Sequence, residues 1–120
     1  MAALEMGFFA VPVLDIQAAK KFYGPVMGWD FNDRDPKFAY IFASGKAIGA
    51  LEESSDKFKP SAQGPLLYFR ADFMTRTLER VQANGGTVQE KLAMEGGANG
   101  YTARVSDPSK NTIGFWAPED

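Results

Sequence analysis

The chain has 120 residues, a formal net charge of −2 and an apolar content of 45%, values typical of one globular domain rather than a disordered or fibrous chain. So small a negative charge disfavours binding to nucleic acid or to an anionic membrane. The sequence shows neither an apolar run of membrane-spanning length nor a signal-like N-terminus, so we expect a cytoplasmic protein.

Cysteine and histidine are both absent from the chain. Without cysteine, the chain cannot form a disulfide, a thiolate nucleophile or a thiolate metal site. Without histidine, it lacks an imidazole general base and the commonest ligand of transition metals. These two absences exclude most familiar catalytic arrangements.

The first half of the chain predicts one strand, one helix and three further strands. Residues 7–14 are apolar and β-prone, which is typical of a buried strand. Asp15 is the predicted N-cap of a helix that ends at Gly28. Its apolar stripe recurs at spacings of three and four, at Ile16, Ala19, Phe22, Tyr23 and Val26. We expect the further strands near residues 29–32, 38–43 and 47–53, with a hairpin turn at 44–46.

The second half repeats this order after a polar linker at residues 54–64. Residues 66–71 are a predicted strand, and Asp72 is the predicted cap of the next helix. This helix has Met74, Leu78 and Val81 on its apolar stripe and stops at Gly85-Gly86. The last predicted strands lie near residues 87–92, 101–106 and 112–116.

The two halves align as an internal duplication. A shift of 57 residues places Asp15 on Asp72, and a shift of 65 places Ile48-Gly49 on Ile113-Gly114. The sequence therefore predicts a single α+β domain over residues 1–120, built of two βαβββ repeats at about 7–53 and 65–117. We expect the repeats to form a curled mixed sheet around a cleft. Because each repeat leaves one sheet face bare, we also expect a homodimer.

Several motifs resemble the vicinal oxygen chelate superfamily, which includes glyoxalase I, bleomycin-resistance proteins and extradiol dioxygenases. In the first repeat the resemblance rests on residues 11–15, on Phe22-Tyr23 and on Met27-Gly28-Trp29. In the second repeat, residues 107–111 resemble the family's Asp-Pro-x-Gly-Asn turn, with Lys110 in place of glycine. The resemblance extends from residue 7 to residue 116. It implies the fold, but not one activity, because this scaffold carries many chemistries.

In the metalloenzymes of that superfamily, the first and last strands of each repeat supply the ligands. The resemblance places these positions at Phe8, Gly49, Leu66 and Gly114, whose side chains offer a divalent metal no ligand atom. A slip of one residue gives Phe9, Ala50, Leu67 or Phe115, which offer none either. We therefore expect no metal and no cofactor, and neither glyoxalase I activity nor extradiol ring cleavage.

If those positions face the cleft, strand alternation predicts an apolar and aromatic lining with one fixed positive charge, Arg70. The predicted ligand-binding residues are Phe8, Ala10, Tyr40, Gly49, Leu51, Leu66, Tyr68, Arg70, Gly114 and Trp116. Such a lining suits a flat, apolar ligand that carries an acidic group. The same residues also have plainer explanations. The aromatic side chains are often core or interface residues, and the glycines can mark close backbone approach.

Three functions are compatible with this sequence. The first is a metal-independent small-molecule binding protein, and the second is a metal-independent lyase or isomerase with an unidentified catalytic residue. Candidates for an acid–base group in that enzyme are Glu52 or Glu53 and Tyr40 or Tyr68. The third is a dimeric scaffold without a ligand, whose cleft is filled by some of its ten phenylalanines.

Overall fold

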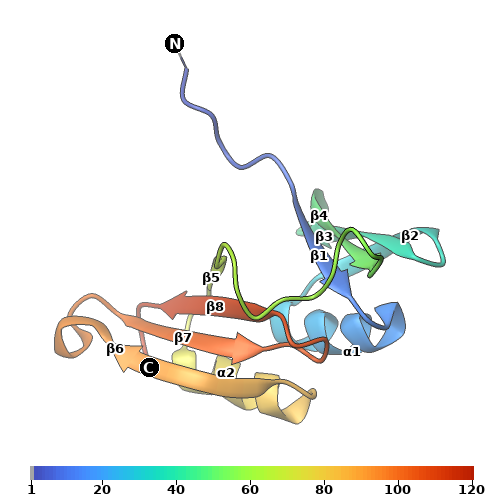
Figure 1. Cartoon of the computed structure of the whole chain (residues 1–120). Coiled ribbons are helices and arrows are strands. Elements are labelled where there is room, and N and C mark those ends of the chain that lie inside the picture. Colours follow the sequence, from blue (N-terminus) through green and yellow to red (C-terminus); the bar gives the residue numbers. More distant parts are fainter. Residues whose placement is uncertain (1) are drawn as a thin grey trace. The chain divides into compact units, whose positions relative to one another are not determined.

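The computed structural model of the chain describes residues 2–120. The chain divides into two compact units, Met1–Pro60 (unit 1) and Ser61–Asp120 (unit 2), and the boundary lies inside the predicted linker. Each unit has its own helix and its own four-stranded sheet (Figure 1).

Unit 1 has the predicted order of one strand, one helix and three strands. Its elements are β1 (Phe9–Val13), α1 (Ile16–Met27), β2 (Asp30–Asp35), β3 (Phe38–Ala43) and β4 (Lys46–Glu53). The strands are arranged in the order β1-β4-β3-β2, with β1 parallel to β4 and the other pairs antiparallel. The hairpin turn between β3 and β4 lies at the predicted place.

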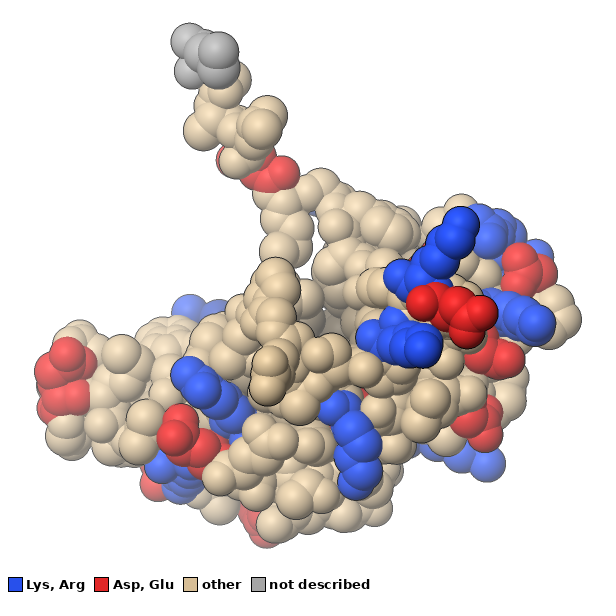
Figure 2. Space-filling view, in the orientation of Figure 1, with Lys and Arg blue, Asp and Glu red and all other residues tan. Residues whose placement is uncertain are grey.

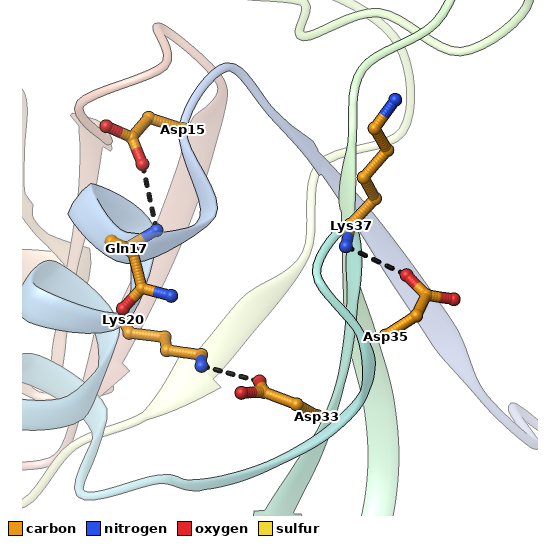
Figure 3. Close-up of polar contacts among 6 residues, drawn as sticks. All are labelled: Asp15, Gln17, Lys20, Asp33, Asp35 and Lys37. Carbon is orange, nitrogen blue, oxygen red and sulfur yellow. Dashed lines mark hydrogen bonds and ion pairs between the residues drawn. The ribbon is translucent and has the colours of Figure 1, made fainter.

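Helix α1 begins at the predicted cap. The Asp15 carboxylate accepts a hydrogen bond from the backbone N–H of Gln17 at 2.9 Å (Figure 3) and another from that of Ala18 at 3.3 Å. All five residues of the predicted apolar stripe are buried. Lys20 of α1 forms an ion pair with Asp33 of β2 (Figure 3), which joins the helix to one face of the sheet.

The side chains of unit 1 divide between a helix-covered face and an opposite face. Asp33 and Ala39 are register partners, as are Ala39 and Leu51, so these three positions share the face toward α1. Val11 pairs with Leu51 on that same face, and both are buried. The opposite face carries Ala50 and its two register partners, Ala10 on β1 and Tyr40 on β3.

Unit 2 repeats the topology of unit 1. Its elements are β5 (Tyr68–Arg70), α2 (Met74–Ala83), β6 (Thr87–Ala93), the short 3-10 helix η1 (Met94–Gly97), β7 (Tyr101–Ser106) and β8 (Thr112–Ala117). The strand order is β5-β8-β7-β6, and β5 is parallel to β8 (Figure 1). The predicted α+β fold and the βαβββ duplication are therefore confirmed. The cleft expected between the repeats stays a prediction.

The start of α2 differs from its prediction, because Asp72 is not its cap. The N-cap residue is Phe73, which provides no side-chain hydrogen bond. Instead, residues at the end of unit 2 satisfy the first amides of the helix. The N–H of Met74 donates to the Glu119 carbonyl at 3.0 Å, and the N–H of Thr75 donates to the Asp120 carbonyl at 2.8 Å. A parallel bridge pairs Phe73 with Glu119, so these last residues of unit 2 lie beside the start of α2.

Lys110, which replaces the glycine of the family's turn, has a left-handed backbone conformation. Its φ is +73°, in the left-handed region that glycine occupies more easily, at a cost of roughly 1 kcal/mol for a residue with a side chain. The buried Asp107 carboxylate holds this turn by accepting the N–H groups of Ser109 and Asn111, both at 2.9 Å. The turn therefore forms without the family's usual glycine.

Candidate functional site

One sheet face of unit 2 collects most of the predicted second-repeat site residues. Tyr68 pairs with Gly114, and Arg70 pairs with Trp116. The next strand adds Arg104 and Thr102, which pair with the same two positions of β8. Lys91 and its partner Ala103 belong to the other face, since the Lys91 ammonium contacts Thr75 of α2. We call the face turned away from α2 the open face of unit 2: Tyr68, Arg70, Thr102, Arg104, Gly114 and Trp116.

Arg70 and Trp116 contact each other on the open face. The guanidinium carbon of Arg70 lies 5.4 Å from the centroid of the Trp116 ring, within the range of a cation–π interaction. The indole N–H of Trp116 donates to the carbonyl of Asn99 at 3.1 Å, which fixes the orientation of the ring. The face thus presents a positioned aromatic surface with a positive charge beside it.

Arg104 contacts Tyr68 in a different way, by a hydrogen bond to its hydroxyl rather than over its ring. The Nε–H group of Arg104 donates to the Tyr68 hydroxyl at 3.4 Å, and the same nitrogen lies 3.9 Å from a Glu90 carboxylate oxygen. The hydrogen bond to Tyr68 is the main cause that raises the pKa of Arg104, with a smaller contribution from Glu90. Both contacts favour the charged form, which an arginine side chain already keeps at neutral pH.

The pairing of Tyr68 with Gly114 leaves space for the tyrosine ring. A Cβ atom at Gly114 would lie 2.6 Å from a carbon of that ring, closer than any real contact. Glycine at this position therefore lets the Tyr68 ring lie flat across β8 toward Arg104.

A pocket of about 240 Å³ adjoins this face in unit 2. It is lined by Ala62, Gln63, Gly64, Pro65, Leu66, Arg104 and Thr112. The pocket includes Leu66, which the sequence placed at the site, and Arg104, which it did not. Alternation along β7 places Thr102 and Arg104 on one face, but only the pairing of β7 with β8 shows that this is the face of Gly114 and Trp116.

In unit 1 the structure brings together only part of the predicted set. Ala10 and Tyr40 flank Ala50 on the face opposite α1, and Phe8, half exposed, precedes β1. Leu51 does not join them, because it lies one residue further along β4 and is fully buried on the helix-covered face. Gly49 is also buried and lies next to the Phe9 carbonyl, so it does not widen an open surface.

Unit 1 has a pocket of its own, of about 430 Å³. It is lined by Arg34, Asp35, Lys37, Phe38, Glu52, Glu53, Ser55 and Phe58. Arg34 lies 3.8 Å above the Phe38 ring and pairs with Asp35, whose carboxylate also accepts the Lys37 N–H at 2.8 Å (Figure 3). Of the acid–base candidates, Glu52 and Glu53 line this pocket, and Tyr40 lies edge-on to Phe38.

The four positions that supply metal ligands in the resembling metalloenzymes do not fit a metal in this chain. Gly49 lies opposite Phe9 and Gly114 lies opposite Tyr68, so neither of these two register pairs presents a carboxylate or an imidazole. Within residues 2–120, no three or more acidic side chains gather closely enough to hold a metal ion. These positions offer contact surface and no coordination.

On the face of the molecule seen in Figure 2, the exposed charges are mixed rather than segregated. In the view of Figure 2, basic and acidic side chains are interspersed, without a broad patch of one sign. Among residues 2–120, neither α-helix combines the length and the apolar character that crossing a membrane requires.

A sequence model described as the Glyoxalase/Bleomycin resistance protein/Dioxygenase superfamily matches residues 5–115. The protein CFP32 of Mycobacterium tuberculosis is 26% identical over 109 residues, which cover 85% of this chain and 41% of that protein. The chain thus spans less than half of the length of this curated relative.

Solved structures share the fold along nearly the whole chain. TnmS3, an antibiotic binding protein from Streptomyces sp. CB03234, is 29% identical, has a TM-score of 0.72 and is matched over 99% of both chains. A glyoxalase/bleomycin resistance protein/dioxygenase family enzyme from Burkholderia phytofirmans has a TM-score of 0.77 at 20% identity, covering 95% of this chain and 98% of its own. With a family match over most of its length and the duplicated βαβββ fold, the chain belongs to the glyoxalase/bleomycin resistance protein/dioxygenase superfamily.

Proposed function

We propose that the protein is a metal-independent small-molecule binding protein that holds a flat, amphipathic or acidic ligand on the open face of unit 2. The observation that carries this proposal is the pairing of two aromatic rings with two arginines on one exposed sheet face, Arg70 with Trp116 and Arg104 with Tyr68. Aromatic rings held in place stack on flat ligands, and guanidinium groups pair with acids.

One of the similar solved structures supports a binding function. TnmS3, the relative that is 29% identical over 99% of both chains, is described as an antibiotic binding protein. The absence of histidine and cysteine from this chain removes the side chains most used for catalysis in a small site.

The proposal is tested first by native mass spectrometry of the untagged protein. We expect an organic adduct and no metal. An equimolar divalent metal would contradict the metal independence of the proposal.

Calorimetry then tests the site with a probe of the proposed chemistry, 8-anilinonaphthalene-1-sulfonate, a flat aromatic sulfonate. We expect Arg70→Ala to weaken its binding severalfold, because this change removes the cation beside Trp116, while the far-ultraviolet circular dichroism stays unchanged. Equal affinity in the variant and the parent would exclude Arg70 from the site.

A second candidate function is a metal-independent lyase or isomerase, favoured by the pocket of unit 1. Glu52 and Glu53 line it together with two phenylalanine rings, so a carboxylate lies beside an apolar wall that could hold a substrate. If the compound that co-purifies with the protein is converted on incubation, and Glu52→Gln or Glu53→Gln stops the conversion, the protein is an enzyme. If the compound is recovered unchanged from the parent, the binding function stands.

A further inference from the structure

The two arginines of the open face have different surroundings. Arg70 lies over the Trp116 ring and is not among the residues that line the pocket of unit 2. Arg104 lines that pocket and is the only charged residue that does so within the described chain. The two arginines therefore belong to two different features of this face, one to an aromatic surface and the other to a charged pocket.

Arg104 also keeps hydrogen-bond donors available. Its contacts with Tyr68 and Glu90 are made through Nε, at 3.4 Å and 3.9 Å. The two terminal amino groups of the guanidinium donate to no side chain among residues 2–120. These are the groups that form a forked pair with a carboxylate, sulfonate or phosphonate.

The rest of the pocket suits a small anion attached to an apolar body. Its lining includes two residues with polar side chains, Thr112 and Gln63, and two apolar ones, Pro65 and Leu66. No acidic residue lines the pocket, so no fixed negative charge within it repels an anion.

We infer that this pocket receives the acidic group of the ligand and that Arg104, rather than Arg70, binds it. Tyr68 is a positioning residue, because its hydroxyl holds the Nε side of the guanidinium and leaves the terminal amino groups directed to the ligand. The inference rests on the proposed function and assigns the acid-binding role within it. The ligand class becomes a flat aromatic compound whose single anionic group reaches past the edge of Tyr68.

A pair of probes that differ only in the acidic group tests this assignment. The anionic probe is 8-anilinonaphthalene-1-sulfonate, and the neutral probe is N-phenyl-1-naphthylamine, which has the same rings without the sulfonate. Arg104→Gln is expected to weaken binding of the anionic probe by about tenfold or more and to leave the affinity for the neutral probe unchanged. Arg70→Gln is expected to weaken binding of both probes by similar factors, because it changes the aromatic surface that contacts their rings.

Arg80→Gln is the matched control, since it removes the same charge from an exposed position on α2. The control should leave both affinities unchanged. If Arg80→Gln lowers the affinity for the anionic probe as much as Arg104→Gln does, the effect is due to net charge and the inference is overturned.

Two further results separate this inference from the proposed function. If the parent binds both probes and Arg104→Gln binds the anionic probe as tightly as the parent, the inference fails and the proposed function stands. If the parent binds neither probe, both fail together.

The positioning role of Tyr68 has its own readout. Tyr68→Phe keeps the ring but removes the hydroxyl, so it should weaken the anionic probe severalfold without affecting the neutral one. Arg104→Lys should restore only part of the anionic selectivity, since an ammonium cannot form the forked pair. If Tyr68→Phe prefers the anionic probe over the neutral one as strongly as the parent does, the positioning role is excluded.

Discussion

Gly49 and Gly114 occupy matched places in the two repeats but meet different neighbours. A Cβ atom at Gly49 would lie 2.4 Å from the Phe9 carbonyl oxygen, which is backbone and cannot move aside alone. A Cβ atom at Gly114 would meet the Tyr68 ring, at 2.6 Å, and this ring is 46% exposed. The same substitution should therefore act on stability at one site and on ligand binding at the other.

We predict that Gly49→Ala lowers the free energy of unfolding by about 2 kcal/mol, as overpacking against backbone does. Gly114→Ala should cost about 1 kcal/mol or less, because the Tyr68 ring can turn into solvent, but it should weaken the aromatic sulfonate probe. Urea unfolding measures the first effect and calorimetry the second. Gly7→Ala is the control, since nothing lies within 4 Å of the added atom. Equal stability losses at Gly49 and Gly114 would contradict this account.

At the scale of elements, the two helices begin in different ways. Asp15 caps helix α1 locally, because its carboxylate accepts a hydrogen bond from a backbone N–H only two residues further along the chain. Helix α2 is held by residues more than forty positions away, where the Asp120 carboxylate contacts Lys91 at 2.6 Å and the Thr75 hydroxyl at 2.9 Å. The bonds from Lys91 and Thr75 lower the pKa of Asp120. Its contribution to stability is therefore complete above the ordinary aspartate pKa and is lost as the pH falls through the lowered value.

The capping difference gives a direct prediction for the two aspartates that the internal duplication aligns. Asp15→Ala should reduce the free energy of unfolding by about 1 kcal/mol, as the loss of an N-cap does. Asp72→Ala should change it by less than about 0.5 kcal/mol, because Asp72 caps nothing. Thermal and urea unfolding of the two variants and the parent would measure both changes in the free energy of unfolding. A comparable loss in both would mean that Asp72 stabilises α2 after all.

The sequence predicted α1, α2 and each β-strand of the described chain from apolar runs and stripes bounded by caps and turns, but it did not predict the 3-10 helix η1. The strands at residues 38–43 and 101–106 match β3 and β7 exactly in extent. The pattern could not predict the cap of α2, since its acceptors come from residues 119 and 120 by tertiary pairing. It also could not predict which face each residue of β4 takes, because the register shifts between Ile41 and Phe42. The matched positions Leu51 and Trp116 consequently lie on differently covered faces of their sheets.

At the scale of the whole molecule, the candidate site was predictable in unit 2 and only partly in unit 1. Tyr68, Arg70, Gly114 and Trp116 share one face as alternation required. Arg104 was missed because its role depends on which strand lies next to β8, and strand order is a property of the fold rather than of local sequence.

We predict that the protein is a homodimer in solution. Several large apolar side chains are exposed on the described chain: Leu4, Met6, Phe8, Phe73, Leu92 and Met94. Exposed apolar side chains in this number favour association with a second copy, and two-fold dimers are the commonest assembly. Sedimentation velocity should give twice the monomer mass at micromolar concentration. A single monomeric species at every concentration would contradict the prediction.

The pairing of first and last strands also sets an order of events during synthesis. In each unit the first strand bonds only to the last, β1 to β4 and β5 to β8. Unit 1 therefore has all its strands once residue 53 has left the ribosome, while unit 2 lacks the partners of its helix until residues 119 and 120 have been made. The nascent chain should thus acquire protease resistance in two steps, the first half well before the second.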